Sequence, residues 1–152
     1  HAIFYNPNGA VGSITTDGST THFNTSSDYR LKENVADISD GITRVKQLTP
    51  RRFNFIADAN KTLDGFLAHE AQSVVPEAVT GVHNGLKVWQ DDEELPDGVS
   101  VGDNKLDADG NTIPEYQGID QSKLVPLLTA ALQEAIAKIE TLETKVAALE
   151  AE

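Results

Sequence analysis

The chain has 152 residues, no cysteine and a formal net charge of -12, a composition that excludes disulfides, thiolate metal sites and cysteine nucleophiles. The acidity is concentrated towards the C-terminus, because residues 1–90 carry 9 acidic and 8 basic side chains whereas residues 91–152 carry 15 and 4. An acidic surface repels phosphate groups, and no apolar run reaches the length of a membrane span. Composition therefore disfavours nucleic acids and anionic membranes as partners.

The first region, residues 1–26, predicts short strands joined by tight turns. The segments 2–5 and 11–14 are β-prone, and turn sequences at 7–9 and 17–18 interrupt them. The apolar side chains of this region are too few to form a core. We therefore expect partners to cover them, with a flexible N-terminal tail as the alternative.

Residues 27–89 predict a small globular part. Apolar residues at helical spacing indicate a helix over 38–48, capped by Asp37 or Ser39 and stopped by Pro50. The other expected elements are a half-buried strand at 53–55, a turn at 58–61, a short strand at 65–67, a short helix at 69–75 ended by Pro76, and a strand at 86–89.

The acidic stretch 90–120 is rich in turn residues and predicts a protruding hairpin or long loop. Asp107, Asp109 and Asn111 resemble the start of a calcium loop. The glycine, however, falls at the fourth position instead of the sixth, and no glutamate stands at the twelfth. The pattern favours a plain hairpin turn, and the sequence predicts neither a metal site nor a cofactor.

The most regular pattern lies in residues 122–152. Eight apolar residues are spaced alternately three and four apart, an unbroken heptad pattern typical of a coiled coil. The a positions are Val125, Leu132, Ile139 and Val146, and the d positions are Leu128, Ala135, Leu142 and Leu149.

Charges beside this stripe favour parallel chains. Lys138 and Lys145 occupy g positions, whereas Glu143 and Glu150 occupy e positions of the following heptads. In a parallel assembly each lysine faces a glutamate of a neighbouring chain, whereas in an antiparallel pair like charges meet.

Two points about this helix stay open. A single amphipathic helix packed on its own domain is the alternative, although a strict 3.5-residue period is narrower than such a helix needs. β-branched a residues with leucine at d favour dimers, but Leu132 and Ala135 interrupt that pattern. Ser122 is expected to cap the helix, which puts Pro126 in the first turn, where a missing N–H costs least.

A short motif follows the first region directly. Its residues are Ser27, Asp28, Arg30, Lys32, Asn34 and Val35. With two later blocks, at 65–77 and 118–128, it resembles the self-cleaving peptidase and chaperone family of phage endosialidases, tail spikes and tail fibres, which also occurs in myelin regulatory factor. The resemblance spans residues 26–150, and His69 stands where the family has glutamine.

The resemblance implies that Ser27 is the nucleophile and Lys32 its general base, with Arg30 and Asn34 in support and cleavage at Ser27–Asp28. A lysine acts as a base only when neutral, which burial or a cationic neighbour such as Arg30 favours. Ser27 cannot easily attack its own carbonyl, because a four-membered ring results. It can attack the carbonyl of Ser26 through a five-membered ring, or the Ser27–Asp28 bond of a neighbouring chain, and the sequence does not choose between these routes.

The fold class expected is α+β, assembled as a parallel homotrimer whose chain number comes from the family resemblance. Residues 1–27 would be the β-rich end of the mature fibre, residues 28–120 the globular chaperone part with the 90–120 protrusion, and residues 121–152 the coiled-coil helix. The implied protein is a phage fibre or spike precursor that assembles in the bacterial host cytoplasm and then releases its chaperone part. Its partners would be its own copies and the upstream fibre segment of the same chain.

Two other functions stay open. One is a non-cleaving trimeric fibre tip that binds a host receptor through the acidic 90–120 segment. The other is a processing domain of a membrane-tethered transcription factor, as in myelin regulatory factor. The lack of a basic or apolar flanking segment argues only weakly against that second function.

Overall fold

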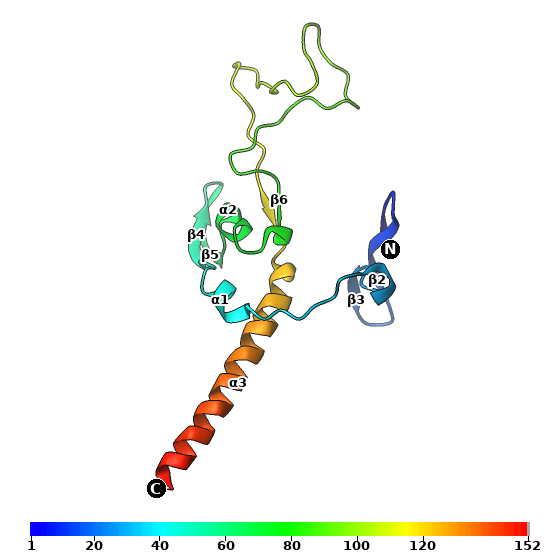
Figure 1. Ribbon diagram of the computed structural model, residues 1–152. Helices are drawn as coiled ribbons and strands as arrows, with labels where there is room; N and C mark the ends of the chain where they lie inside the picture. The colour runs from blue at the N-terminus through cyan, green and yellow to red at the C-terminus, as the bar shows by residue number, and fades with distance from the viewer. Residues whose placement is uncertain (152) are drawn as a thin grey trace. The chain divides into compact units, whose positions relative to one another are not determined.

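The computed structural model describes residues 1–151 as two compact units, divided between Asp37 and Ile38. The first unit is a three-stranded antiparallel sheet in the order β1-β2-β3, followed by the short 3-10 helix η1 (Figure 1). Its elements are β1 Ala2–Asn6, β2 Gly9–Thr16, β3 Thr21–Thr25 and η1 Tyr29–Leu31. The two predicted strands are confirmed, and β3 is an addition that sequence patterning did not indicate.

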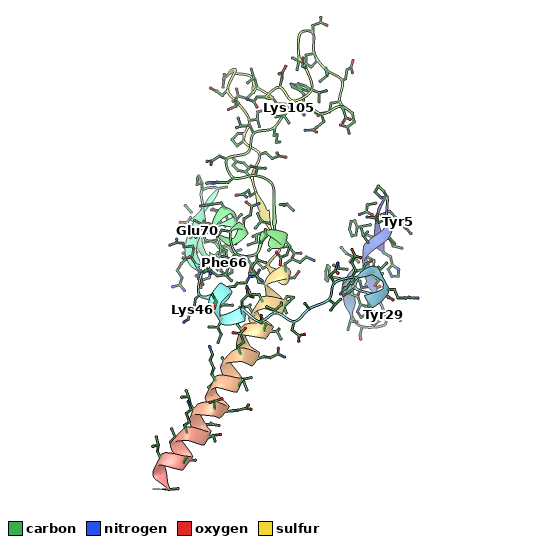
Figure 2. The ribbon with its side chains drawn as sticks, in the orientation of Figure 1. Tyr5, Tyr29, Lys46, Phe66, Glu70 and Lys105 are labelled. Carbon is green, nitrogen blue, oxygen red and sulfur yellow. The ribbon has the colours of Figure 1, made fainter. Side chains whose placement is uncertain are left out.

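None of residues 1–37, all of which the structure describes, is buried. The large side chains of the sheet lie open to solvent, with Phe23 77% and Tyr5 71% exposed (Figure 2). A three-stranded sheet with no covered face has little hydrophobic burial to offset the entropy of ordering the chain.

The second unit is a mixture of short elements and one long helix (Figure 1). In chain order they are α1 Gly41–Val45, β4 Arg51–Phe55, β5 Asp58–Gly65, α2 Ala68–Gln72, η2 Pro76–Ala78, β6 Val79–Thr80, β7 Gly118–Ile119, η3 Gln121–Leu124 and α3 Val125–Glu150. The expected combination of strands with a long C-terminal helix is confirmed. No helix within residues 1–151 is long and apolar enough to cross a bilayer.

The core of this unit lies where α2 and η2 pack against η3 and the first turns of α3. Its buried residues are Val74, Val75, Ala78, Leu124 and Leu127. Five partly buried apolar side chains pack against these residues: Val45, Leu48, Phe66, Val79 and Ile119. The core therefore joins segments far apart in sequence at the N-terminal end of α3.

The helix predicted over 38–48 is shorter at both ends than expected. The α1 helix begins at Gly41, and its N-cap residue, Asp40, makes no capping bond with its side chain. Instead the Glu134 carboxylate on α3 accepts the N–H groups of Gly41 and Ile42, at 2.5 and 3.2 Å. A Cβ on residue 41 would lie 2.5 Å from the backbone nitrogen of Ala131. Packing against α3, which local sequence does not reveal, fixes where α1 starts.

The hairpin β4–β5 corrects the turn expected at 58–61. Those residues begin β5, and the chain turns at Ile56 and Ala57 instead. Asn54 explains the difference, because its side-chain amide donates to the Ala59 carbonyl at 3.0 Å and so fastens the start of β5.

Two neighbouring predictions also needed correction. The strand expected at 65–67 is only the last residue of β5, and the helix expected at 69–75 is the shorter α2. Pro76 begins η2, where its missing N–H is harmless.

A long excursion, residues 81–117, connects β6 to β7 without helices (Figure 1). Three of its segments meet through a closed ring of backbone hydrogen bonds: Lys87 N–H to Ile113, Ile113 N–H to Lys105, and Lys105 N–H to Lys87, at 2.9, 3.1 and 2.8 Å. The strand predicted at 86–89 therefore forms only isolated bridges. The sequence predicted a protruding hairpin or long loop at 90–120, and the structure places a helix-free excursion at 81–117.

Side chains reinforce the excursion at two places. The Lys105 ammonium pairs with Glu93 and lies 4.7 Å from the centre of the Trp89 ring. Farther along, the Asp107 carboxylate accepts the N–H groups of Asp109 and Asn111 at 3.0 and 2.8 Å. The oxygen that a calcium loop would direct at an ion thus closes a hairpin turn.

The α3 helix begins at Val125, so Ser122 is not its N-cap. Ser122 lies in η3, whose own cap is Asp120, and its backbone N–H donates to the Asp120 carboxylate at 3.0 Å. Pro126 stands in the first turn of α3, as expected. The helix buries Leu127, Ala130 and Ala131.

Candidate active site

Ser27 directly follows the end of the three-stranded sheet. Ser26, the residue before it, is tied to β2 by two hydrogen bonds: its backbone N–H donates to the Val11 carbonyl at 3.1 Å and its hydroxyl to the Ala10 carbonyl at 3.2 Å. The backbone before Ser27 is therefore anchored to regular structure rather than hanging free.

The η1 turn brings Lys32 back to Ser27. The Asp28 carboxylate caps this turn by accepting the Arg30 N–H at 2.9 Å, and the Lys32 N–H donates to the Tyr29 carbonyl at 3.1 Å. As a result the Lys32 ammonium donates to the Ser27 hydroxyl oxygen at 2.8 Å. The two residues that the sequence singled out as nucleophile and base are in direct hydrogen-bond contact.

Arg30 is bound to Asp28 rather than aimed at Lys32. Its guanidinium donates from Nε and Nη2 to the two carboxylate oxygens, at 2.9 and 2.8 Å. This pair, helped by the Arg30 backbone N–H, lowers the pKa of Asp28, while Asp28 raises the pKa of Arg30. The positive charge of Arg30 is thus largely balanced before it can act on Lys32, and its contact with Asp28 was not foreseen from the sequence.

The surroundings of the dyad are open and partly apolar. Ser27 and Lys32 are exposed, and so are the large side chains of Tyr29, Leu31 and Val35. A single chain therefore leaves the dyad in water, with a cluster of uncovered apolar side chains beside it.

Asn34 has an unusual backbone conformation. Its φ of 53° lies in the left-handed region, which asparagine tolerates better than most residues. The structure thus assigns a turn-forming backbone to Asn34, which the sequence presented as a supporting residue.

The second and third sequence blocks build the core rather than the dyad. Val75 of the second block is 1% exposed, and Leu127 of the third is 2% exposed. Ile119 of the third block pairs with Val79 in the β6–β7 ladder. His69, which stands in place of the family's glutamine, stacks on His83 with ring centres 4.3 Å apart.

The predicted seam residues of α3 lie on its uncovered surface. Exposed fractions of the large ones run from 48% at Leu128 to 71% at Leu149, and Ala135 is partly covered. Ile136, at an e position, is 46% exposed and widens this apolar stripe. Heptad reasoning missed Ile136 because it scored only the a and d positions. The stripe consists of Val125, Leu128, Leu132, Ala135, Ile136, Ile139, Leu142, Val146 and Leu149.

Comparison with known proteins addresses the segment that holds the dyad. Residues 27–80 match a peptidase family described as the chaperone of endosialidase. No curated protein matches the chain. The matched segment runs from Ser27 through the second sequence block to the end of β6. The match thus confirms, over residues 27–80, the resemblance to this peptidase and chaperone family that was seen in the sequence.

Proposed function

We propose that the chain is the self-cleaving intramolecular chaperone of a trimeric phage tail fibre or spike, released by attack of Ser27 with Lys32 as general base. The observation that carries this proposal is the 2.8 Å contact between Lys32 Nζ and Ser27 Oγ within the family segment. Two such residues five apart are common on surfaces, but here they are in direct contact beside an anchored strand end and within the segment that matches the family.

The chemistry is a serine acyl transfer. Lys32 first loses its ammonium proton and then takes the Ser27 hydroxyl proton while Oγ bonds to the carbonyl carbon. The C–N bond breaks as Lys32 passes that proton to the departing amide nitrogen. Water then hydrolyses the ester, which restores the Ser27 hydroxyl and leaves a carboxylate on the upstream product.

The two routes differ in the product they leave. Attack on the Ser26 carbonyl of the same chain gives a downstream product that starts at Ser27. Attack by a neighbouring chain on the Ser27–Asp28 bond gives one that starts at Asp28. Both are single-turnover reactions in place.

The uncovered stripe of α3 supports assembly. The helix packs on its own unit through Leu127, Ala130 and Ala131, whereas the a and d residues form another, exposed face. One domain therefore uses one face of α3 and leaves a second apolar face for other chains. We propose a parallel homotrimer, in which the e-position Ile136 adds the wider seam that more than two chains require.

Such a trimer would act as a template. Holding three N-terminal segments together raises their local concentration and sets their register, which lowers the entropic barrier to pairing between chains. Removing the template after pairing leaves the fibre kinetically locked. In this proposal the partners are the other copies and the upstream fibre segment, in the host cytoplasm during phage assembly.

The test is cleavage of the chain followed by mass spectrometry of the products. We expect the unmodified chain to give a downstream product starting at Ser27 or Asp28, and Ser27→Ala and Lys32→Ala to stay full length. Lys32→Arg keeps a positive charge that cannot act as a base, so it should also stay full length. Lys46→Ala changes an exposed lysine outside the site and serves as the control. Normal cleavage of Lys32→Ala would disprove the dyad.

A further inference from the structure

We propose that Asp28 is a positioning residue for self-cleavage, acting as the cap that holds the η1 turn and so keeps Lys32 on Ser27. This inference rests on the proposed function. The Asp28 carboxylate neither accepts the serine proton nor donates to the leaving group, although in the route that cuts Ser27–Asp28 the backbone nitrogen of Asp28 is itself the departing atom. In this proposal the Asp28 carboxylate is what keeps the Lys32 side chain within hydrogen-bond distance of Ser27.

The first argument is the path of the backbone. In an extended chain, residues five apart are separated by roughly 17 Å, too far for a stable contact between a lysine and a serine. The single turn of η1 shortens this path, and its hydrogen bonds run from Leu31 and Lys32 back to Asp28 and Tyr29, both at 3.1 Å. An isolated turn of this length is unstable in water, so its cap matters.

The second argument is that Asp28 makes every contact expected of such a cap. Its Oδ1 accepts the Arg30 N–H at 2.9 Å and the Arg30 Nε at 2.9 Å, while Oδ2 accepts Nη2 at 2.8 Å. The guanidinium thus fixes the carboxylate in the orientation that caps the backbone. Arg30 serves here as a clamp on Asp28.

The third argument concerns charge. Because the guanidinium and carboxylate form a bidentate pair, their net effect on Lys32 is small compared with a free cation at the same place. If Arg30 acts as a cationic activator, every variant that neutralises both groups should lose the same rate. If Asp28 acts as a cap, only variants that lose the acceptor oxygen at position 28 should slow. Neutral variants that differ only in the cap separate the two explanations.

The experiment compares two double variants with equal charge. In Asp28→Asn/Arg30→Gln the side-chain oxygen at position 28 still accepts the backbone N–H, and in Asp28→Ala/Arg30→Gln it is gone. First-order cleavage rate constants are measured from roughly pH 7 to 11.5, a range that brackets the ordinary lysine pKa of about 10.4. We expect the alanine variant to cleave about tenfold more slowly than the asparagine variant, with the same pH midpoint. Equal rates overturn the proposal, as does a difference that comes only from a shifted midpoint.

Two further measurements keep failure of this inference distinct from failure of the proposed function. Asp64→Ala breaks another bidentate surface pair, that with Arg52, and should leave the cleavage rate unchanged; an equal loss would overturn the positioning role. In a Ser27→Ala background, where no cleavage occurs, hydrogen exchange of the Arg30 amide reports the cap alone. We expect adding Asp28→Ala to speed that exchange about fivefold, and an unchanged exchange rate contradicts the cap even if the chain never cleaves.

Discussion

The N-terminal sheet and the core of the second unit differ in how much of themselves a single chain can bury. Around α2, η2 and the start of α3, Val75 and Leu127 are almost fully enclosed. In the three-stranded sheet, Phe4 is 53% and Phe23 77% exposed, and no residue of 1–37 is buried. The core around α2, η2 and the start of α3 is complete within one chain, whereas the three-stranded sheet carries apolar side chains that one chain leaves uncovered.

The α3 helix contains the same contrast within one element. Its first turns bury Leu127, Ala130 and Ala131, and its later turns leave Ile139, Leu142 and their seam neighbours open. Surfaces of this extent on a chain with a net charge of -12 are typical of interfaces rather than of solvated faces. The core around the start of α3 can therefore fold within one chain, whereas we propose that the N-terminal sheet and the seam of α3 are covered only in the trimer.

The largest effect is expected from disrupting the exposed seam of α3 while leaving the buried core unchanged. Ile139→Asp/Leu142→Asp places two carboxylates on the seam, where burial without partners is costly. We expect light scattering to show a fall in mass from three chains to one. Thr141→Asp/Thr144→Asp adds the same charges to the opposite face of that turn and should leave the mass unchanged. A wild-type chain that is already monomeric, or a seam variant that stays trimeric, would disprove the assignment of the seam.

A second pair of variants sharpens the comparison within the monomeric seam variant. Leu127→Ala should lower the free energy of unfolding by about 2–5 kcal/mol, because a buried leucine leaves a cavity. Leu132→Ala should change it by less than about 0.5 kcal/mol, since that side chain is 62% exposed in one chain. Urea unfolding followed by circular dichroism measures both. Equal losses would mean that the core and the seam are not distinct.

Glu134 provides a smaller test of the core region. Its carboxylate accepts the N–H groups of Gly41 and Ile42, so Glu134→Ala should cost about 1–2 kcal/mol of unfolding free energy. Glu134→Gln keeps one acceptor oxygen and should lose less. Thermal unfolding of the two variants gives the order, and the reverse order would rule out the interhelical cap.

The smallest effect is local and concerns the turn between β2 and β3. The Asp17 carboxylate bonds the His22 ring and the N–H groups of Ser19 and Thr20, which lowers its pKa from 3.8 to about 2. Because the folded pKa lies below the ordinary value, this stabilisation is present above pH 4 (roughly the unfolded pKa) and is lost as pH falls through about 2. Carbon NMR of the Asp17 carboxyl group should show the lowered pKa, and His22→Ala should raise that pKa. An unchanged pKa in His22→Ala would mean that His22 does not bond Asp17.

Sequence reasoning succeeded where a pattern is local. The heptad spacing located α3, and turn residues placed the strands β1 and β2. The family motif drew attention to Ser27 and Lys32, whose side chains lie 2.8 Å apart, and their roles as nucleophile and base stay a prediction. Each of these depends on residues within a few positions of one another.

The errors come from side-chain and packing contacts that residue spacing does not determine, at long range for α1 and at short range for β5 and Arg30. The start of α1 is fixed by Glu134 and the backbone of Ala131. The start of β5 is fastened by Asn54 across the hairpin. The pairing of Arg30 with Asp28, though local, depends on a rotamer that residue spacing does not determine.

The dyad lies in residues 1–37, where one chain buries no residue. The most direct test is therefore whether cleavage depends on trimer formation. Ser27 and Lys32 are exposed in one chain, and a lysine becomes a base more readily when neighbouring subunits exclude water from it. The measurement is the cleavage rate of Ile139→Asp/Leu142→Asp beside wild type across pH. We expect the wild-type rate to rise with pH as a lysine deprotonates, and cleavage to be lost in the monomeric variant. Equal rates in a demonstrably monomeric variant would contradict this expectation.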